Sequence, residues 1–214
     1  MLQFPRTEYI FSARRRVMSA QFLSKSEAAF VAGLDAAVVD RAIDRLRIGR
    51  PFVQRRRRAR LLTAKGAFLI AADHLISRDI AAPARKELRK RLAALLREKP
   101  IEAVETIAVP SSALQMTIDF KPVSDGVAKR LSALEAALAL IVEDDEVQAG
   151  APTFRGTRML VRPIVDALRR GVPADELIAD YGLSPEQIAA ARVYGDARPQ
   201  RGRPSLSGSA ETMD

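Results

Sequence analysis

The stretch "FLSKSEAAFVAGLDAAVVDRAIDRLRIGRP", residues 22–51, carries two helix signatures in succession. Ser24 and Glu27 have the S-x-x-E spacing of a capping box, which predicts the start of a helix, and Gly33 can end that helix in the left-handed conformation. Asp35 stands where a side chain can cap a second helix. Two short helices joined by a glycine-containing turn are typical of a helix-turn-helix.

The second helix of this stretch has one apolar face and one charged face. Its apolar residues recur at helical spacing: Val39, Ala42, Ile43 and Leu46. Gly49 and Pro51 are expected to stop the helix. Arg41 and Arg45 lie one turn apart, and this spacing predicts that both face the groove of bound DNA.

The next stretch, "PFVQRRRRARLLT" at residues 51–63, predicts a two-stranded wing. Phe52 and Val53 can begin one strand, and Leu61 and Leu62 can end the other. Five arginines within six positions repel one another, which favours a bound polyphosphate; a solvated, partly disordered loop is the alternative. The predicted DNA-binding residues are Arg41, Arg45, Arg47, Arg55, Arg56, Arg57, Arg58 and Arg60.

The positive charge is concentrated in the first half of the chain. Residues 1–99 hold 23 Lys and Arg against 9 Asp and Glu, a balance of +14, whereas residues 100–214 hold 12 against 17, a balance of −5. Such an asymmetry indicates that one segment meets a polyanion while the remainder serves another purpose. Residues 1–21, with Arg14–Arg16, form either a DNA arm or part of the first domain.

Composition bounds both the fold and the chemistry. Aromatic residues make up 5% of the 214 residues and Trp is absent, which favours cores of Ala, Leu, Val and Ile and hence a mainly helical protein. Cysteine is absent and the one histidine, His74, has no second ligand at metal-binding spacing, so we expect no metal and no cofactor. A signal-peptide pattern and apolar stretches of bilayer length are also absent, so we expect a cytoplasmic protein.

The middle of the chain predicts two helices followed by a hairpin. Thr63 can cap a helix that runs through Ile76, and a second helix follows from Pro83. The segments "VETIAV" from Val104 and "LQMTIDF" from Leu114 predict two antiparallel strands. Because a lone hairpin is marginal in water, it is expected to pack on a helix or pair with a second copy of the chain.

A heptad-like apolar seam begins after Ser124. Its residues are spaced by four, three, four and three positions: Val127, Leu131, Leu134, Leu138 and Ile141. The seam can serve dimerisation, which is the basis for expecting a homodimer, or it can be core against the hairpin and need no partner. The spacing does not separate these two readings.

Three short helices are predicted in the last third of the chain. Pro163 suits the first turn of one helix and Gly171 supplies its left-handed cap. The second, "ADELIADYG", follows Pro173, and the third opens with a capping box at Ser184 and Gln187. Three such helices make a small helix-turn-helix-like module.

This part of the chain, "GAPTFRGTRMLVRPIVDALRRGVPADELIADYGLSPEQIAAARVYG" at residues 150–195, resembles the small bacterial family of domain of unknown function 433. The matching residues are Gly150, Pro152, Gly156, Thr157, Arg158, Val161, Gly171, Tyr181, Leu183, Ser184, Ile188, Ala191 and Tyr194. The resemblance covers about a quarter of the chain and implies that the Gly-Thr-Arg corner shapes a turn rather than performs chemistry. Ala149 departs from the pattern, since many relatives carry glycine there.

The resemblance implies a VapB-type antitoxin. Family members are commonly encoded beside a VapC-type toxin with a PIN domain, a magnesium-dependent ribonuclease, and longer members begin with a MerR-like helix-turn-helix. Residues 22–46 are similar to such a beginning. We therefore expect two partners, a PIN-domain toxin and double-stranded operator DNA through which the antitoxin regulates its own operon. Arg158 is expected to pair with Asp166 or with a carboxylate of residues 143–146.

Beyond Gly195 the sequence "DARPQRGRPSLSGSAETMD" is rich in Pro, Gly and Ser and predicts a flexible tail. Arg198, Arg201 and Arg203 are held apart by Pro and Gly. Their guanidinium groups suit carboxylates, which the toxin's acidic site offers, so the three arginines are the predicted toxin-binding residues. A tail left free in solution is the alternative.

The predicted organisation is mainly α and has four parts: a MerR-like winged helix-turn-helix domain at residues 1–78, a helical linker with a β-hairpin at 79–140, the trihelical domain at 141–195 and the tail at 196–214. A MerR-like regulator without any toxin is the alternative function. A nuclease using Asp144, Asp145 and Glu146 is disfavoured, because consecutive carboxylates do not converge on one ion and no base or nucleophile motif accompanies them. We expect no catalytic residues.

Overall fold

The structure, a computed structural model, describes residues 22–56, 59–77, 79–109 and 116–200. Several predictions from the sequence lie outside these residues. They concern the arm at 1–21, the tail beyond 200, and the side chains of Arg57, Arg58, Arg201 and Arg203. The described chain is mainly helical, as the composition predicts, and its sheets are three two-stranded pairs.

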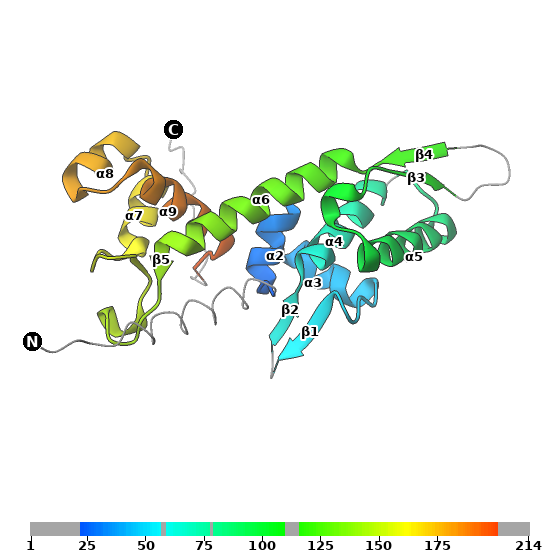
Figure 1. The fold of residues 1–214 in the computed structure, drawn as a ribbon, viewed down its shortest axis with the longest axis horizontal. Helices are drawn as coiled ribbons and strands as arrows, with labels where there is room; N and C mark the ends of the chain where they lie inside the picture. The colour runs from blue at the N-terminus through cyan, green and yellow to red at the C-terminus, as the bar shows by residue number, and fades with distance from the viewer. Residues whose placement is uncertain (1–21, 57–58, 78, 110–115, 201–214) are drawn as a thin grey trace, which may run out of the picture.

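The N-terminal unit consists of two short helices, a hairpin and a longer helix (Figure 1). Its elements are α2 (Lys25–Ala32), α3 (Ala36–Arg45), β1 (Val53–Arg56), β2 (Ala59–Leu62) and α4 (Ala64–Ile76). The antiparallel pairing of β1 with β2 places Val53 opposite Leu62. This is the predicted winged helix-turn-helix arrangement.

The predicted cap of the first helix is confirmed, and that of the second is corrected. Ser24 Oγ accepts from the Glu27 amide at 3.3 Å, and the Glu27 carboxylate accepts from the Ser24 amide at 2.8 Å. Gly33 ends α2 with φ 69°. Asp35 is the N-cap residue of α3 but makes no side-chain capping bond, and α3 ends at Arg45, earlier than the predicted stop at Gly49.

The middle of the chain forms the predicted helix and hairpin and leads into a long helix. These elements are α5 (Ala82–Glu98), a 3-10 turn η1 (Ile101–Ala103), β3 (Thr106–Val109), β4 (Met116–Asp119) and α6 (Lys121–Leu140). Thr106 of β3 faces Asp119 of β4 in the antiparallel register. Helix α6 begins three residues before the predicted Ser124, because Pro122 fits its first turn.

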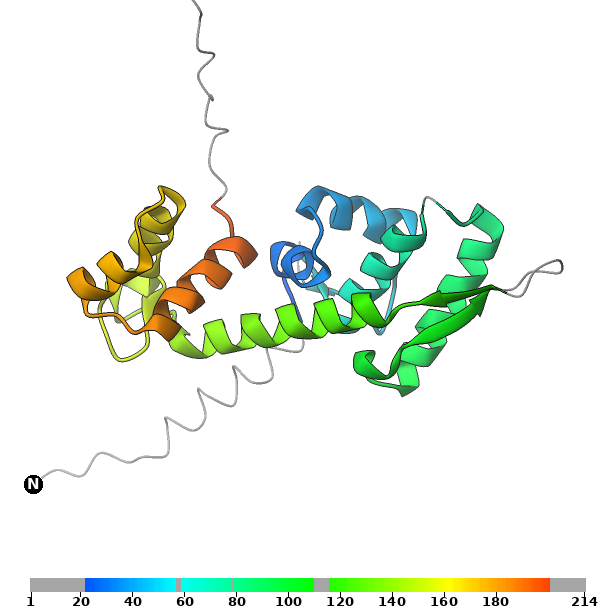
Figure 2. The same cartoon turned by 90° about the horizontal axis from the view of Figure 1, so that it is seen from above.

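Helix α6 is the axis of the molecule, running from the β3–β4 hairpin to the C-terminal module (Figures 1 and 2). Val127 and Leu134 of the predicted seam are buried in the N-terminal core, and Leu131 and Leu138 pack against it. Ile141 lies just past the helix, in the core of the C-terminal module. The apolar seam therefore packs into the hydrophobic cores of this chain. Contact with a second copy of the chain is not needed to explain its spacing.

The C-terminal module contains the three predicted helices and a short strand pair that the sequence did not reveal. Its elements are β5 (Ile141–Val142), a 3-10 turn η2 (Gln148–Gly150), β6 (Thr153–Phe154), α7 (Val161–Arg169), α8 (Ala174–Tyr181) and α9 (Pro185–Ala197). Phe154, Ile164 and Tyr194 are buried in its core. The predicted capping box of α9 is present, with Ser184 and Gln187 bonded in both directions.

The two cores meet at the end of α9. Most of its buried residues belong to the C-terminal core, but Ala197 is fully buried in the N-terminal core. The predicted boundary between the module and the tail, residue 195, is therefore corrected: the helix continues to Ala197. Among the described residues, no helix combines the length and the apolarity needed to cross a membrane.

Candidate nucleic-acid interface

A groove of about 250 Å³ lies between α3 and the wing. Its lining residues are Ile43, Asp44, Arg47, Ile48, Val53, Arg55 and Arg60. Three of the predicted DNA-binding arginines are thus brought together: Arg47 from the segment just after α3, and Arg55 and Arg60 from the wing. Their convergence gives a surface that attracts phosphate.

One of these arginines is neutralised within the groove. Arg60 Nη1 donates to Asp44 Oδ1 at 2.5 Å, and this ion pair ties β2 to α3. Arg47 and Arg55 are exposed and, within the described residues, neither has a carboxylate within 4.0 Å. The groove therefore keeps two uncompensated positive charges.

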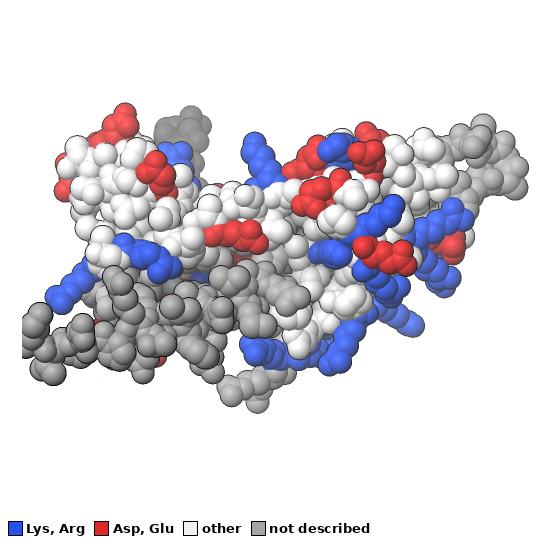
Figure 3. Space-filling model, viewed as in Figure 1, with Lys and Arg blue, Asp and Glu red and all other residues white. Residues whose placement is uncertain are grey.

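Arg41 and Arg56 are two further exposed arginines on the elements that form the groove. Both side chains are exposed, Arg41 on α3 and Arg56 at the end of β1, and the described part of the chain offers neither an ion-pair partner. In Figure 3 the Lys and Arg side chains gather along one side of the molecule, over the wing and the neighbouring helices. These arginines are therefore available to the predicted interface.

Arg45 has a partner that the sequence reasoning did not assign. Its Nη2 donates to Asp73 Oδ2 at 3.0 Å, and Asp73, on α4, is fully buried. Arg89 donates to the same carboxylate at 2.8 Å, and Arg85 lies 3.8 Å from it. The Arg45 side chain is still 57% exposed, but its guanidinium joins α3 to α4 and α5. The sequence signal that could have indicated this partner is Asp73 itself, a lone aspartate inside the apolar stretch of α4.

The Gly-Thr-Arg corner forms a turn, as the family resemblance implies. Gly156 has φ 76°, and Thr157 Oγ1 donates to the Phe154 carbonyl at 2.9 Å and accepts from the Met159 amide at 3.1 Å. Arg158 is exposed and pairs with no described carboxylate, so the expected ion pair with Asp166 or residues 143–146 is wrong. Glu143 instead forms an ion pair with Arg198.

The other motif residues also build the backbone of the module. Gly150 has φ 78°, and a Cβ there would lie 2.8 Å from Asp145 Oδ1. The Pro152 carbonyl accepts from the Val161 amide at 2.9 Å, which closes the loop at the start of α7. Tyr181, at the end of α8, is 48% exposed. The motif therefore positions helices and leaves one aromatic side chain at the surface.

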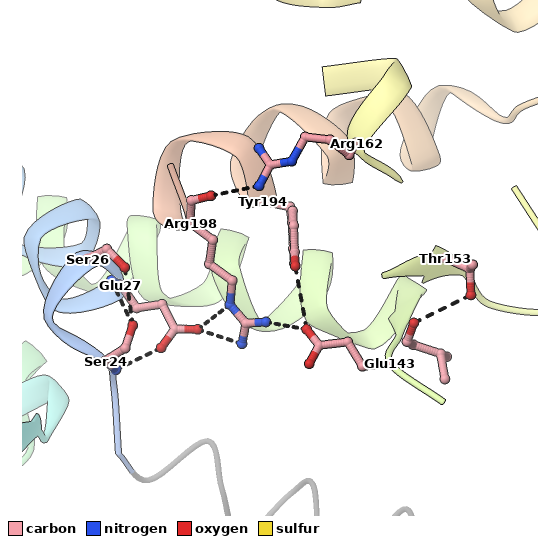
Figure 4. Close-up of polar contacts among 9 residues, drawn as sticks. Ser24, Ser26, Glu27, Glu143, Thr153, Arg162, Tyr194 and Arg198 are labelled. Atoms are coloured by element: carbon pink, nitrogen blue, oxygen red, sulfur yellow. Dashed lines mark hydrogen bonds and ion pairs between the residues drawn. The ribbon is translucent and has the colours of Figure 1, made fainter. Parts of the chain in front are cut away.

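Arg198 joins the two halves of the molecule (Figure 4). Its Nε donates to Glu27 Oε1 at 2.8 Å and its Nη1 donates to Glu143 Oε1 at 2.6 Å. The guanidinium also lies 5.3 Å from the centroid of the Tyr194 ring. We call these four residues, Glu27, Glu143, Tyr194 and Arg198, the junction. Arg198 was predicted as part of the tail, and no local pattern pointed to its partner Glu27, 171 positions away.

The electrostatics of the junction favour the charged form of Arg198. Burial opposes its charge, but the Glu27 carboxylate outweighs this, through both its charge and its hydrogen bond, with help from Tyr194 and Glu143, so the pKa of Arg198 is raised. Burial also raises the pKa of Tyr194, against the opposing effect of Arg198. The junction is thus a partly buried cluster with one cation and two carboxylates.

A second groove, of about 400 Å³, lies on the C-terminal module. Its lining residues are Val165, Leu168, Arg169, Gly171, Val172, Pro173, Arg192 and Asp196.

The carboxylates considered for a nuclease, Asp144, Asp145 and Glu146, are all exposed, on a turn outside this groove. In the described ranges no three His, Asp or Glu side chains are placed to hold a metal ion together.

The chain is similar to known proteins in three comparisons. Residues 141–194 match the family described as "Protein of unknown function (DUF433)". The chain is 28% identical over 201 residues to the uncharacterized protein y4eO of Sinorhizobium fredii (strain NBRC 101917 / NGR234), covering 88% of this chain and 87% of that protein. The crystal structure of Rv2018 from Mycobacterium tuberculosis is 18% identical, covers 79% of this chain and 96% of its own, and has a TM-score of 0.35.

The family match falls on the strand pair and the three helices of the C-terminal module, from β5 to the buried Tyr194 of α9. It ends just before the part of α9 that docks on the N-terminal unit. The C-terminal module, residues 141–194, is a DUF433 domain.

Proposed function

We propose that this protein is a DNA-binding antitoxin whose N-terminal unit binds operator DNA and whose C-terminal module captures a PIN-domain ribonuclease toxin. The observation that carries the proposal is the groove between α3 and the wing, where Arg47 and Arg55 lie together without compensating carboxylates. The toxin half of the proposal is supported by the family resemblance of the C-terminal module.

The DNA half follows from where the charges lie. A helix exposing Arg41 beside a wing exposing Arg55 and Arg56 offers one element for the major groove and one for the flanking phosphates. Arg45 acts differently from the prediction: with its guanidinium on Asp73, it positions α3 against α4 and α5. Specific contacts to bases are then made by Arg41 rather than by an Arg41–Arg45 pair.

The toxin half of the proposal is assigned to two of the three predicted toxin-binding arginines. Arg198 is engaged in the junction, so the proposed insertion into the acidic toxin site falls to Arg201 and Arg203, which lie outside the described residues. Guanidinium groups bind carboxylates in bidentate fashion, and a nuclease site that has lost its magnesium presents such carboxylates.

The DNA half is tested by the salt dependence of duplex binding. Arg55→Ala/Arg56→Ala should lower the slope of log K against log[NaCl] by about 0.9 per lost phosphate contact, measured by fluorescence anisotropy. Arg158→Ala/Arg170→Ala removes the same charge from the exposed surface of the C-terminal module and serves as control. Equal slopes for all three proteins contradict the assignment of the wing.

The toxin half is tested with the product of the adjacent reading frame. Co-expressed with the full chain, a PIN-domain toxin should co-purify and lose its ribonuclease activity. A chain ending at Gln200 should still bind DNA but should inhibit cleavage less, because Arg201 and Arg203 are gone. Full inhibition by the shortened chain would contradict the role of these arginines, and absence of any co-purifying toxin would contradict the antitoxin.

A transcriptional regulator without a toxin is the second candidate. The observation that favours it is the junction, because Arg198 holds the C-terminal module against the first helix of the DNA-binding unit. A module fixed in this way suits a role in arranging DNA binding. Duplex binding with the expected salt slope, together with no toxin partner, would select this candidate.

A further inference from the structure

We propose that helix α5 carries a second nucleic-acid contact, formed by Lys86, Lys90 and Arg97 and directed at the phosphates of duplex DNA that flanks the winged helix-turn-helix. We call these three residues the α5 stripe. The inference rests on the DNA-binding half of the proposed function and is independent of the toxin.

The α5 stripe follows from the helical spacing of its residues. Lys86, Lys90 and Arg97 are separated by four and seven positions, which places them on one face of the helix, and all three are exposed. The opposite face is apolar and fully buried: Leu88, Leu92 and Leu96. Helix α5 therefore cannot rotate, and its basic face is held outward by the core.

Helix α5 is connected to the candidate interface at two points, one through Arg97 and one through a buried ion-pair cluster. Arg97 Cζ lies 5.9 Å from the centroid of the Phe52 ring, and Phe52 directly precedes the first wing strand. Further along α5, Arg89 shares the buried Asp73 with Arg45 of α3. Helix α5 is thus fixed against both DNA-facing elements, and Figure 3 shows basic side chains from the wing to this helix.

The charge of α5 is only partly compensated within the described chain: Arg85 and Arg89 share Asp73, whereas two of the three stripe residues have no carboxylate partner. The helix carries six basic residues, Arg85, Lys86, Arg89, Lys90, Arg91 and Arg97. Its acidic residues are Glu87 and Glu98, and Glu87 lies 3.6 Å from Lys90 and 3.8 Å from Arg91. Lys86 and Arg97 have no described carboxylate within 4.0 Å. Like charges one turn apart destabilise a helix slightly, and a bound polyanion removes that cost.

The length of the stripe fits duplex phosphates. Lys86 and Arg97 are eleven positions apart, which is about 16 Å along a helix at 1.5 Å per residue. The phosphates of one strand of a duplex recur about every 3.4 Å per base pair along the axis, so the stripe spans about five base pairs. A row of separated cations of this length matches several consecutive phosphates of a DNA backbone. It is too long to be occupied by a single carboxylate or a free phosphate.

The experiment compares the salt dependence of binding of a 30-base-pair duplex by matched double variants. Lys86→Gln/Lys90→Gln should lower the slope of log K against log[NaCl] by about 1.8, at about 0.9 per contact. Arg158→Gln/Arg170→Gln, with the same loss of charge in the C-terminal module, should leave the slope within about 0.3 of the unmodified chain. Lys86→Arg/Lys90→Arg keeps the charges and should retain the slope.

The outcomes separate the two proposals. If Arg55→Ala/Arg56→Ala lowers the slope and Lys86→Gln/Lys90→Gln behaves like the control, the stripe is not a DNA contact while the wing remains one. If the unmodified chain does not bind the duplex in dilute salt, the DNA-binding function fails with it. Binding of polyglutamate that depends on Lys86 and Lys90 and exceeds binding of the duplex would assign the stripe to an acidic protein. Equal melting temperatures of the variants and the unmodified chain would show that the substitutions do not unfold the protein.

Discussion

At the scale of single residues, Ala149 is held in a conformation that suits glycine. Its φ of 51° and ψ of 40° are left-handed, where the Cβ of an L-residue meets the following carbonyl oxygen. The sequence comparison with family 433 had marked this position as a departure from glycine. The left-handed backbone explains why glycine suits this position, since the loop before β6 turns here.

Ala149→Gly should therefore stabilise the protein by about 0.5–1 kcal/mol, because relief of the left-handed strain outweighs the added flexibility of the unfolded chain. The measurement is urea unfolding followed by circular dichroism. The control is Ala151→Gly, where φ is −66° and ψ is 143°, and glycine should cost about 0.5–1 kcal/mol. Destabilisation by both changes would show that the left-handed geometry of Ala149 is not strained.

Asp73 is the second residue on which local structure depends. A fully buried carboxylate is stable only when it is paired and hydrogen-bonded, and three guanidinium groups from α3 and α5 meet this need. Removing the carboxylate leaves three arginines facing one another at a buried point.

Asp73→Asn should destabilise the protein by about 3 kcal/mol, since the amide keeps the shape of the side chain and loses its charge. Arg45→Ala should cost less than about 1 kcal/mol, because the Arg45 side chain is 57% exposed and Arg89 still holds the carboxylate. Urea unfolding of both variants checks the order. Equal losses in the free energy of unfolding for the two variants would contradict the dominant role of the buried Asp73.

At the scale of elements, the approach of α7 to α9 depends on Gly195. A Cβ built there would lie 2.5 Å from Val165 Cγ1, far closer than carbon atoms tolerate. The sequence pattern treated Gly195 as the end of the helix, but α9 continues past it. The glycine is present because another helix crosses at this point, which a single helix pattern does not reveal.

Gly195→Ala should destabilise the protein by about 1–2 kcal/mol despite alanine's better helix propensity, because the added methyl overpacks the contact. Val165→Ala in the same chain removes the clashing methyl groups and should recover part of the loss, as thermal unfolding would show. Gly126→Ala on α6 is the control: its nearest neighbour is the end of Arg130 at 3.4 Å, so it should stabilise by about 0.5–1 kcal/mol. Additive effects of Gly195→Ala and Val165→Ala would refute the contact.

At the scale of the whole molecule, the junction connects the N-terminal unit to the DUF433 domain. Glu27 is part of the capping box of α2 and is only 6% exposed, yet its second oxygen binds Arg198 at the end of α9. Ala197 is buried beside it in the N-terminal core. The last turn of the C-terminal module therefore contributes to the stability of the first helix of the other unit.

Arg198→Ala should destabilise the protein by about 2 kcal/mol, because the nearly buried Glu27 loses its cation. Glu27→Gln keeps the cap of α2 and removes the charge, so the double variant should cost less than the sum of the two single ones. The measurement is a double-mutant cycle by urea unfolding, with Arg192→Ala, an exposed arginine of α9, as control. A coupling energy near zero would show that the ion pair contributes nothing to holding the units together.

The sequence by itself determined the elements whose signals are local. The capping boxes at Ser24 and Ser184 and the left-handed Gly33 and Gly171 each depend on residues within one turn. The apolar ends of the wing strands and the alternation of the hairpin strand depend on residues within one strand pair. The same holds for the DUF433 domain, whose turns and caps have fixed spacing. The arginine-rich candidate interface was predicted for the same reason, because its arginines lie close together in the sequence.

Only the tertiary structure decided which charges are free and which are engaged. Arg41 and Arg45 look alike in the sequence, but a buried carboxylate on α4 engages only Arg45. Arg198 looks like part of a tail until a carboxylate 171 positions away is placed beside it. Side chains of the same type differ in role because burial and ion pairing depend on neighbours from distant segments, and no local spacing contains that information.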